Sequence, residues 1–285
     1  MSKKFMAMPR WAKASKILII FTVLVLVPIF YFNRIAIKEY FIKSKSVDLP
    51  QEQSVNDVSS FGADLKDDNN VETIYESSVQ NENMHIQNSP NPHEQQIKQE
   101  INLKIPFTIQ SPDQKWDEVY KEGCEEASIL MVYSFLRDRS ITVNSAMKDI
   151  GDMIKLQNEI FGGQYNLSAS TTAYLANKFF GLDSQIVQLK SIEDIKSILS
   201  NGDPLILPTL GRELKNPNFK VPGPIYHMLV VKGYTKDGVI ITNDPGTRKG
   251  KDYTYNQNIL FNAIGDWDYD IEAPNANLKT AIILK

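Results

Sequence analysis

Cysteine and histidine are scarce in this chain of 285 residues, which contains one cysteine and three histidines. One cysteine cannot form an internal disulfide, a zinc knuckle or an iron–sulfur site. A basic excess is also lacking, because the formal net charge is −3, and nucleic-acid-binding proteins usually carry a basic face. The phosphate-binding pattern GxxxxGK[ST] does not occur. We therefore expect no cofactor, no bound metal, no nucleotide and no nucleic-acid partner.

The N-terminal region predicts a membrane anchor. Residues 1–16 are basic and contain no acidic residue, and the uncharged apolar run ILIIFTVLVLVPIFYF follows them. Extended over residues 17–37, with Arg34 reaching the interface, the segment is long enough for a hydrocarbon core of about 30 Å. No small-x-small cleavage site follows it, which favours an uncleaved signal anchor over a cleaved signal peptide or a buried core helix. The positive-inside rule then predicts residues 1–16 as a cytoplasmic tail, with the rest of the chain extracytoplasmic.

Residues 38–100 predict a disordered acidic linker. They are rich in Gln, Asn, Ser and Glu, and their scattered apolar residues show no sustained period. Such a composition buries too little apolar surface to offset the entropy of ordering. Two of the histidines, His85 and His93, lie here and are interpreted as solvated linker residues. Residues 101–285 are then the folded domain, and their length supports one sizeable core.

The order of elements in this domain predicts an α+β fold. Segments with helical or strand-like periodicity come first along the chain. A predicted β-hairpin follows, with Asp237-Gly238 as the turn between two β-rich segments. Helices are expected over 124–137, from the N-cap Asn144 to 160, over 170–180 and after Ser191. Strands are expected over 101–109, 184–189, 204–210, 226–234, 239–243, 253–255 and 278–284. Most of the helices precede a β-rich half, which is an α+β layout and not an alternating one.

The single cysteine lies where a helix should begin. Cys124 follows Gly123, so free N–H groups and the positive end of the helix dipole favour its thiolate and could bind an oxyanion. Glu125 and Glu126 oppose this, because negative charge beside the thiol disfavours ionisation. Most single cysteines are small buried apolar residues, so a catalytic role requires partners from elsewhere in the fold.

A partner is available in the predicted hairpin. His227, the one histidine of the domain, lies near the start of the first strand, and Asp244 directly follows the second. The hairpin register returns Asp244 to the level of His227. A carboxylate at that point could accept a proton from one ring nitrogen, fix the tautomer and stabilise the imidazolium. A nucleophile, a base and an orienting carboxylate on separate elements form the usual arrangement for acyl transfer.

Three motifs occur in order over roughly residues 103–250. They are IPFTIQSP at 105–112, GCEEASILMV at 123–132, and YHMLVVKGY at 226–234, the last followed by NDP at 243–245. They resemble the opening strand, the nucleophile helix and the histidine block of the C39-like peptidases, a branch of the papain-like cysteine peptidases. The specificity of the resemblance comes from the occurrence of all three motifs in the right order.

This resemblance implies a papain-like fold, with an N-terminal helical part that carries the nucleophile and a C-terminal antiparallel sheet. It implies that Cys124 is the nucleophile and that His227 is the general base and acid. Asp244 would orient His227, and the neighbouring Asn243 is the alternative, since papain itself uses an asparagine.

For the oxyanion, the resemblance implies a side-chain amide donor beside the backbone N–H of Cys124. Gln110 matches the family's position, and Gln114 is a second candidate because it lies closer to Cys124 in sequence. The loops 161–170 and 211–225 are expected to rim the groove.

These patterns predict a membrane-anchored thiol hydrolase, most simply a peptidase acting on a peptide or protein substrate outside the membrane. Amidase and transpeptidase activities stay open, because an acyl-enzyme can be resolved by water, an amine or a thiol. The alternative is a catalytically idle papain-like module that binds peptides or cell-envelope ligands. Without a phosphate-binding loop, the arrangement in which this peptidase type is fused to an ATP-driven exporter is absent.

Overall fold

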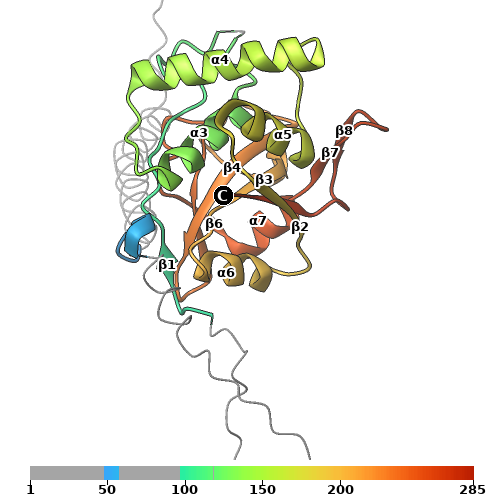
Figure 1. Ribbon diagram of the computed structural model, residues 1–285. Coiled ribbons are helices and arrows are strands. Elements are labelled where there is room, and N and C mark those ends of the chain that lie inside the picture. The colour runs from blue at the N-terminus through green and yellow to red at the C-terminus, as the bar shows by residue number, and fades with distance from the viewer. Residues whose placement is uncertain (1–47, 58–96, 118) are drawn as a thin grey trace, which may run out of the picture. The chain divides into compact units, whose positions relative to one another are not determined.

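The computed structural model describes residues 48–57, 97–117 and 119–285 (Figure 1). Residues Leu49–Lys285 belong to one compact unit. The predicted tail, the predicted anchor at 17–37 and most of the predicted linker lie outside the described residues. Within the described part of the chain, no helix is both long enough and apolar enough to span a membrane.

The domain combines helices with an antiparallel sheet, as predicted. The helices are α3 (Cys124–Leu136), α4 (Val143–Phe161), α5 (Ala169–Phe180), α6 (Ile192–Ser200), α7 (Gln257–Ala263) and the 3-10 helix η1 (Gly211–Leu214). The strands are β1 (Ile101–Asn102), β2 (Ser184–Gln188), β3 (Leu205–Leu210), β4 (Tyr226–Tyr234), β5 (Val239–Asn243), β6 (Tyr253–Asn256), β7 (Asp266–Asp268), β8 (Ala273–Asn275) and β9 (Thr280–Leu284).

Strand β4 lies at the centre of the main sheet. The strand order is β2-β9-β3-β4-β5-β6, with β1 also paired to β4, and every pairing is antiparallel. All nine residues of β4 are buried, which explains its nearly continuous apolar sequence. The predicted hairpin is confirmed with its exact strand limits at 226–234 and 239–243.

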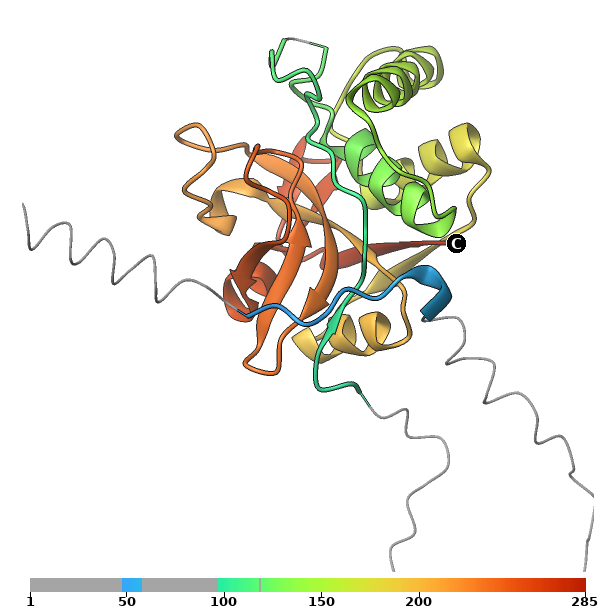
Figure 2. The same ribbon diagram turned by 90° about the vertical axis from the view of Figure 1, so that its left-hand side faces the viewer.

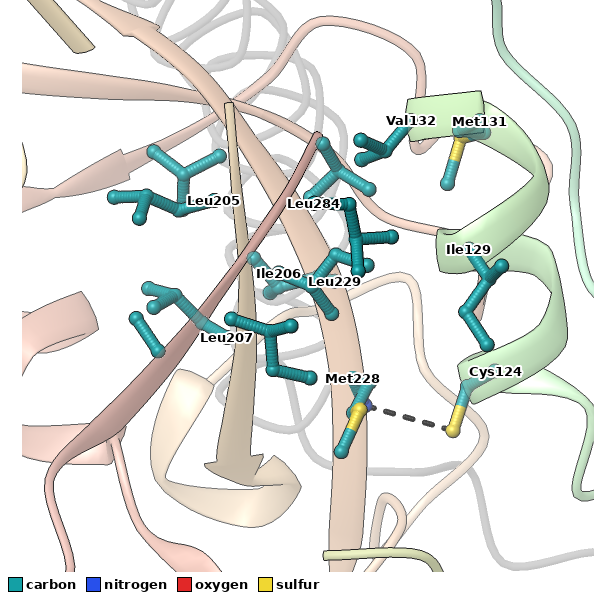
Figure 3. Packing of buried hydrophobic residues seen from close by; sticks show 14 of the residues in the cluster. Cys124, Ile129, Met131, Val132, Leu205, Ile206, Leu207, Met228, Leu229 and Leu284 are labelled. Carbon is teal, nitrogen blue, oxygen red and sulfur yellow. Dashed lines mark hydrogen bonds between the residues drawn. The ribbon is translucent and has the colours of Figure 1, made fainter. Parts of the chain in front are cut away.

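Helices α3, α4 and α5 gather on one side of the sheet, and α6 lies apart from them (Figures 1 and 2). Helix α3 packs directly on β4 and is buried around most of its circumference. Its residues Ile129 and Val132 face Leu229 of β4 and Leu284 of β9 in one apolar cluster (Figure 3). A helix that is apolar on nearly all sides belongs in the interior, so the start of α3 is held firmly against β4.

Several element boundaries differ from the predictions for local reasons. The strand expected over 101–109 is paired to β4 only at Ile101–Asn102, and Pro106 has no N–H to donate to a ladder. Helix α4 begins one residue before the expected N-cap Asn144, because the Thr142 side chain accepts the Ser145 N–H and caps the helix. Helix α7 and the β7–β8 hairpin were not predicted.

Residues 49–57, which we term the N-terminal strap, pack against the domain. The Gln53 N–H donates to the Asn102 oxygen at 2.7 Å, and the Lys104 N–H donates to the Gln53 oxygen at 2.7 Å. The Asn102 side chain donates to the Pro50 oxygen at 2.9 Å. Figure 2 shows the blue strap crossing next to β1 and the green segment that follows it. These residues were predicted to be part of the linker, because a short polar segment held by backbone hydrogen bonds has no apolar periodicity to reveal it.

A bulge in β4 directs a lysine toward the strap. The β4–β5 register shifts between Val231 and Gly233, and the intervening Lys232 is fully buried. Its ammonium lies 2.8 Å from Glu52 Oε1 of the strap and 2.6 Å from Asp252 Oδ1. Gly233 is required beside it, because a Cβ there would collide with the backbone oxygen of Ile101. The bulge therefore joins strap and sheet through a buried ammonium group and two partly exposed carboxylates.

Candidate active site

Cys124 is the first residue of α3 and faces β4. Its side chain is 5% exposed, and Sγ accepts the Met228 N–H at 3.5 Å (Figure 3). That amide is available because the β4–β5 pairing ends at Val230, two residues further along the strand. The thiol itself donates to Glu125 Oε2 at 3.0 Å. The lone cysteine of the chain is thus held at a helix N-terminus, beside the residue that follows His227.

The resting thiol of Cys124 is neutral. Burial raises its pKa well above the ordinary value, and the neighbouring Glu125 carboxylate raises it further. The sequence contained two opposing effects, the helix dipole and the adjacent acidic residues. In the folded protein the pKa is raised by burial first and by the acidic neighbours second, while the hydrogen bond from the Met228 N–H lowers it. A nucleophilic Cys124 therefore needs a base that removes its proton.

His227 and Asp244 form a buried pair. Nε2 of His227 lies 2.8 Å from Asp244 Oδ1, and the two side chains are 3% and 0% exposed. The carboxylate assigns the ring proton to Nε2, so Nδ1 carries the free lone pair. Nδ1 forms no hydrogen bond with any residue in the described part of the chain. The hairpin thus brings Asp244 to His227 as the sequence indicated and leaves one ring nitrogen available as a base.

Asp244 is held by donors on both of its oxygens. Oδ1 also accepts the Gly246 N–H at 2.9 Å, while Oδ2 accepts from the Tyr255 hydroxyl at 2.7 Å and from Asn216 Nδ2 at 3.1 Å. Burial on its own would raise the pKa of Asp244, but the contact with His227 and the hydrogen bonds from Tyr255 and Gly246 hold the pKa below its ordinary value. Asp244 is therefore ionised and fixed in orientation. Tyr255 and Asn216 were missed by the sequence analysis, because neither lies in a motif or near Asp244 in a predictable register.

Asn243, the alternative orienting residue, points elsewhere. Its Nδ2 donates to the Ile105 oxygen at 3.1 Å, and its Oδ1 accepts the Asp252 N–H at 3.2 Å. Both ends of this amide connect the end of β5 to neighbouring segments. The geometry therefore gives the contact with His227 to Asp244.

Gln110 lies close to the start of α3, but its amide is engaged. Nε2 donates to the Lys121 oxygen at 2.6 Å and to the Tyr120 oxygen at 3.3 Å, just before the helix begins. The two hydrogens of the amide are thus directed to loop carbonyls. Gln114 lies on an exposed turn with φ 65°. The role of either glutamine as an oxyanion donor stays a prediction, and for Gln110 it requires release of these bonds.

The ring of His227 is packed from two sides. Phe219 meets it edge to face with centroids 5.3 Å apart. Gly246 lies so close that a Cβ on it would be 2.8 Å from His227 Cε1 and 3.1 Å from Nε2. Only a residue without a side chain fits at position 246 while the imidazole keeps its place.

Gly246→Ala is expected to lower the catalytic rate about 100-fold, because a ring displaced by even about 1 Å loses its alignment. The rate should be compared with that of Gly151→Ala, whose added Cβ would meet only the Tyr120 hydroxyl, at an ordinary 3.4 Å. Circular dichroism and thermal unfolding check that both variants fold. A Gly246→Ala enzyme with the wild-type rate contradicts the packing argument.

Two acidic residues follow Cys124 inside the core. Glu125 Oε1 accepts the Leu167 N–H at 3.1 Å and so ties the loop between α4 and α5 to the site. Glu126 is 0% exposed, and neither of its oxygens has a hydrogen-bond partner among the described residues. Burial raises the pKa of Glu126 well above the ordinary value, and the charge of Glu125 adds to this. Glu126 is thus a buried neutral acid.

Glu126→Gln is expected to stabilise the protein more at high pH than at low pH. Because the pKa is raised in the folded state, the native protein binds more protons than the unfolded chain above about pH 4.3, and stability falls as the pH rises from there. The variant removes this loss, with a gain of about 1–3 kcal/mol at neutral pH. Urea unfolding at about pH 5 and pH 8 measures it. An equal gain at both pH values speaks against a proton-linked cost at Glu126.

Comparison with known proteins identifies the family. The model of the Peptidase_C39-like family matches residues 92–270, so this chain belongs to that family, as its three motifs indicated. A similar solved structure is the crystal structure of a protein from Bacillus anthracis assigned as a C39-like peptidase. It is 20% identical, the match covers 65% of this chain and 97% of that chain, and the TM-score is 0.40. No curated protein matches the chain. The family is that of a cysteine-peptidase-like module.

Proposed function

We propose that the domain is a thiol-dependent peptidase with Cys124 as nucleophile, His227 as base and acid, and Asp244 as the residue that orients His227. One observation carries this proposal. In a chain of the C39-like family, a buried carboxylate binds Nε2 of the histidine at 2.8 Å, and the cysteine sulfur lies against the very next residue of the same strand. A base with its tautomer fixed is thereby available to a nearby thiol.

The proposed reaction begins with a rotation of the thiol. Sγ leaves Glu125, turns toward Nδ1 of His227, and loses its proton to Nδ1 as it attacks the substrate carbonyl. The resulting imidazolium is stabilised by the ionised Asp244. The N–H of Cys124 has no partner within the helix and can donate to the oxyanion.

Breakdown of the tetrahedral intermediate expels the amine, which takes the proton from His227 and leaves a thioester on Cys124. Water, deprotonated by the same imidazole, then attacks the thioester and restores the thiol, with a carboxylic acid as product. An amine in place of water would give transpeptidation by the same steps. The proposed enzyme would therefore act as a hydrolase when water attacks the thioester and as a transpeptidase when an amine does.

A mixed peptide library tests the proposal. The purified full chain is incubated with the library, and new peptide termini are identified by mass spectrometry. Cleavage by the wild type and none by Cys124→Ala supports the thiol mechanism. Cleavage that persists in Cys124→Ala, or a wild type that cleaves no peptide, contradicts it.

One observation favours the alternative function, a catalytically idle module that binds peptides. The resting thiol of Cys124 forms its hydrogen bond with Glu125 and not with His227. This reading predicts peptides that bind without being cut. Glu125→Gln separates the two functions. In a peptidase, the variant should ease rotation of the thiol and speed alkylation of Cys124, and this effect should be lost when His227→Ala is added.

We also propose that residues 17–37 anchor the protein in a membrane with the domain on the extracytoplasmic side. The support is the uncharged run that follows a basic tail. Full-length protein should remain in the membrane pellet after alkaline carbonate extraction. Protease added to right-side-out vesicles should degrade the domain, whereas degradation only in inside-out vesicles contradicts this orientation.

A further inference from the structure

A pocket of 780 Å³ lies beside the candidate active site. Four basic side chains line it, and among the residues that the structure describes no acidic side chain does. The basic residues are Lys121, Lys220, Arg248 and Lys249. The chain as a whole carries a net charge of −3, so this cluster of basic residues is opposite in sign to the net charge of the protein.

The pocket reaches the wall of the active site. Gly246, which lines it, lies against the ring of His227 and donates its N–H to Asp244. Arg248 and Lys249 follow in the same loop, so their backbone is tied to the His227–Asp244 pair within two or three residues. Gly246 thus stands between a ligand in the pocket and the ring of His227.

Three of the cations have no ion-pair partner among the described residues. Lys220, Arg248 and Lys249 are exposed, and none forms an ion pair with any residue in the described part of the chain. Unpaired cations that share one concave surface raise the local concentration of anions. An arginine among them can bind a carboxylate through two parallel hydrogen bonds.

We propose that this basic pocket binds an acidic segment of the peptide substrate, close to the bond that is cut. The proposal rests on the proposed peptidase function and adds the substrate class. Glutamate or aspartate side chains match the cations, and Trp116 supplies an apolar wall for the aliphatic parts of the peptide. Because the cations are exposed, the attraction should weaken at high salt.

Binding to an inactive enzyme tests the charge preference. The full chain with Cys124→Ala is titrated against a fluorescent glutamate-rich peptide and a matched peptide with glutamine in place of glutamate, by fluorescence polarisation. The acidic peptide should bind about tenfold more tightly at low ionic strength, since exposed pairs are each worth little and three act together. The preference should shrink several-fold at about 0.5 M salt.

Two matched triple variants locate the site. The first removes the pocket cations by Lys220→Gln, Arg248→Gln and Lys249→Gln, and the second removes exposed lysines outside the pocket by Lys178→Gln, Lys190→Gln and Lys236→Gln. Both variants change the net charge equally. The preference for the acidic peptide should be lost in the first and kept in the second.

Equal binding of the two peptides overturns the proposal, as does a preference that survives the first triple variant. Polyphosphate that binds in the pocket while the acidic peptide does not also overturns it, because the ligand is then another class of polyanion. Since Cys124→Ala cannot turn over substrate, this result is independent of whether the library experiment finds cleavage. A failure of the proposed chemistry is thereby distinguished from a failure of the proposed substrate class.

Discussion

His227→Ala should lower the rate of peptide cleavage by about 10³-fold or more. The variant loses both the base that takes the thiol proton and the acid that protonates the leaving amine. The loss is large here because burial and Glu125 raise the pKa of Cys124, so few thiolates form without the base. Initial rates on one cleaved peptide, normalised to correctly folded protein, give the measurement. An active His227→Ala enzyme would falsify the assignment of the base.

The same assay ranks substitutions of Asp244. Asp244→Ala leaves Nε2 of His227 and the Tyr255 hydroxyl without their acceptor, and Asn216 keeps only its hydrogen bond to Tyr255. Asp244→Asn keeps an oxygen for Nε2 but sets an amide hydrogen against the Asn216 donor, so it should retain more activity than the alanine variant. Equal rates in the two variants would mean that orientation of the ring by this side chain does not matter.

The second large effect concerns stability. Glu52→Gln combined with Asp252→Asn should cost about 3–5 kcal/mol of unfolding free energy, because the fully buried Lys232 then keeps an uncompensated charge. Each single substitution should cost much less, since the other carboxylate still pairs with the ammonium. The two effects are therefore expected to be strongly non-additive. Urea unfolding of the full chain measures the free energy of unfolding of the wild type, the two single variants and the double variant.

Lys232→Met supplies the control for this cluster. Added to the double variant, it removes the unpaired charge and keeps the apolar stem, so most of the lost stability should return. If the triple variant stays as unstable as the double, the cost comes from packing of the strap and not from the buried charge.

The sequence predicted those parts of the site that depend on local signals. The Asp237-Gly238 turn fixed the hairpin limits, and the limits brought Asp244 back to His227. Gly123 and the apolar spacing after it placed Cys124 at a helix start. The limits of a hairpin and the start of a helix depend on a few neighbouring residues, so turn residues and apolar periodicity predict them directly.

Features that depend on distant segments were not predictable. Asp244 accepts from Asn216, in the loop after η1, and from Tyr255, in β6. Only the assembled fold brings these residues together. The strap was missed for the same reason, since Gln53 is held by backbone atoms of Asn102 and Lys104. Likewise, two opposing influences on the pKa of Cys124 could be named from sequence, but their balance depends on burial.

The N-terminal strap affects the outcome of a proteolytic cut between residues 58 and 96. Residues 58–96 connect two segments, ending at Asp57 and resuming at Ile97, that belong to the same compact unit. A single cut by a protease within 58–96 would sever the covalent link between residues 1–57 and the domain. The two pieces would nevertheless stay together through the backbone hydrogen bonds of Gln53 and the Lys232–Glu52 ion pair. Separation of the two pieces would then require dissociation of the strap as well as proteolysis, so its rate would depend on ionic strength as well as on the protease.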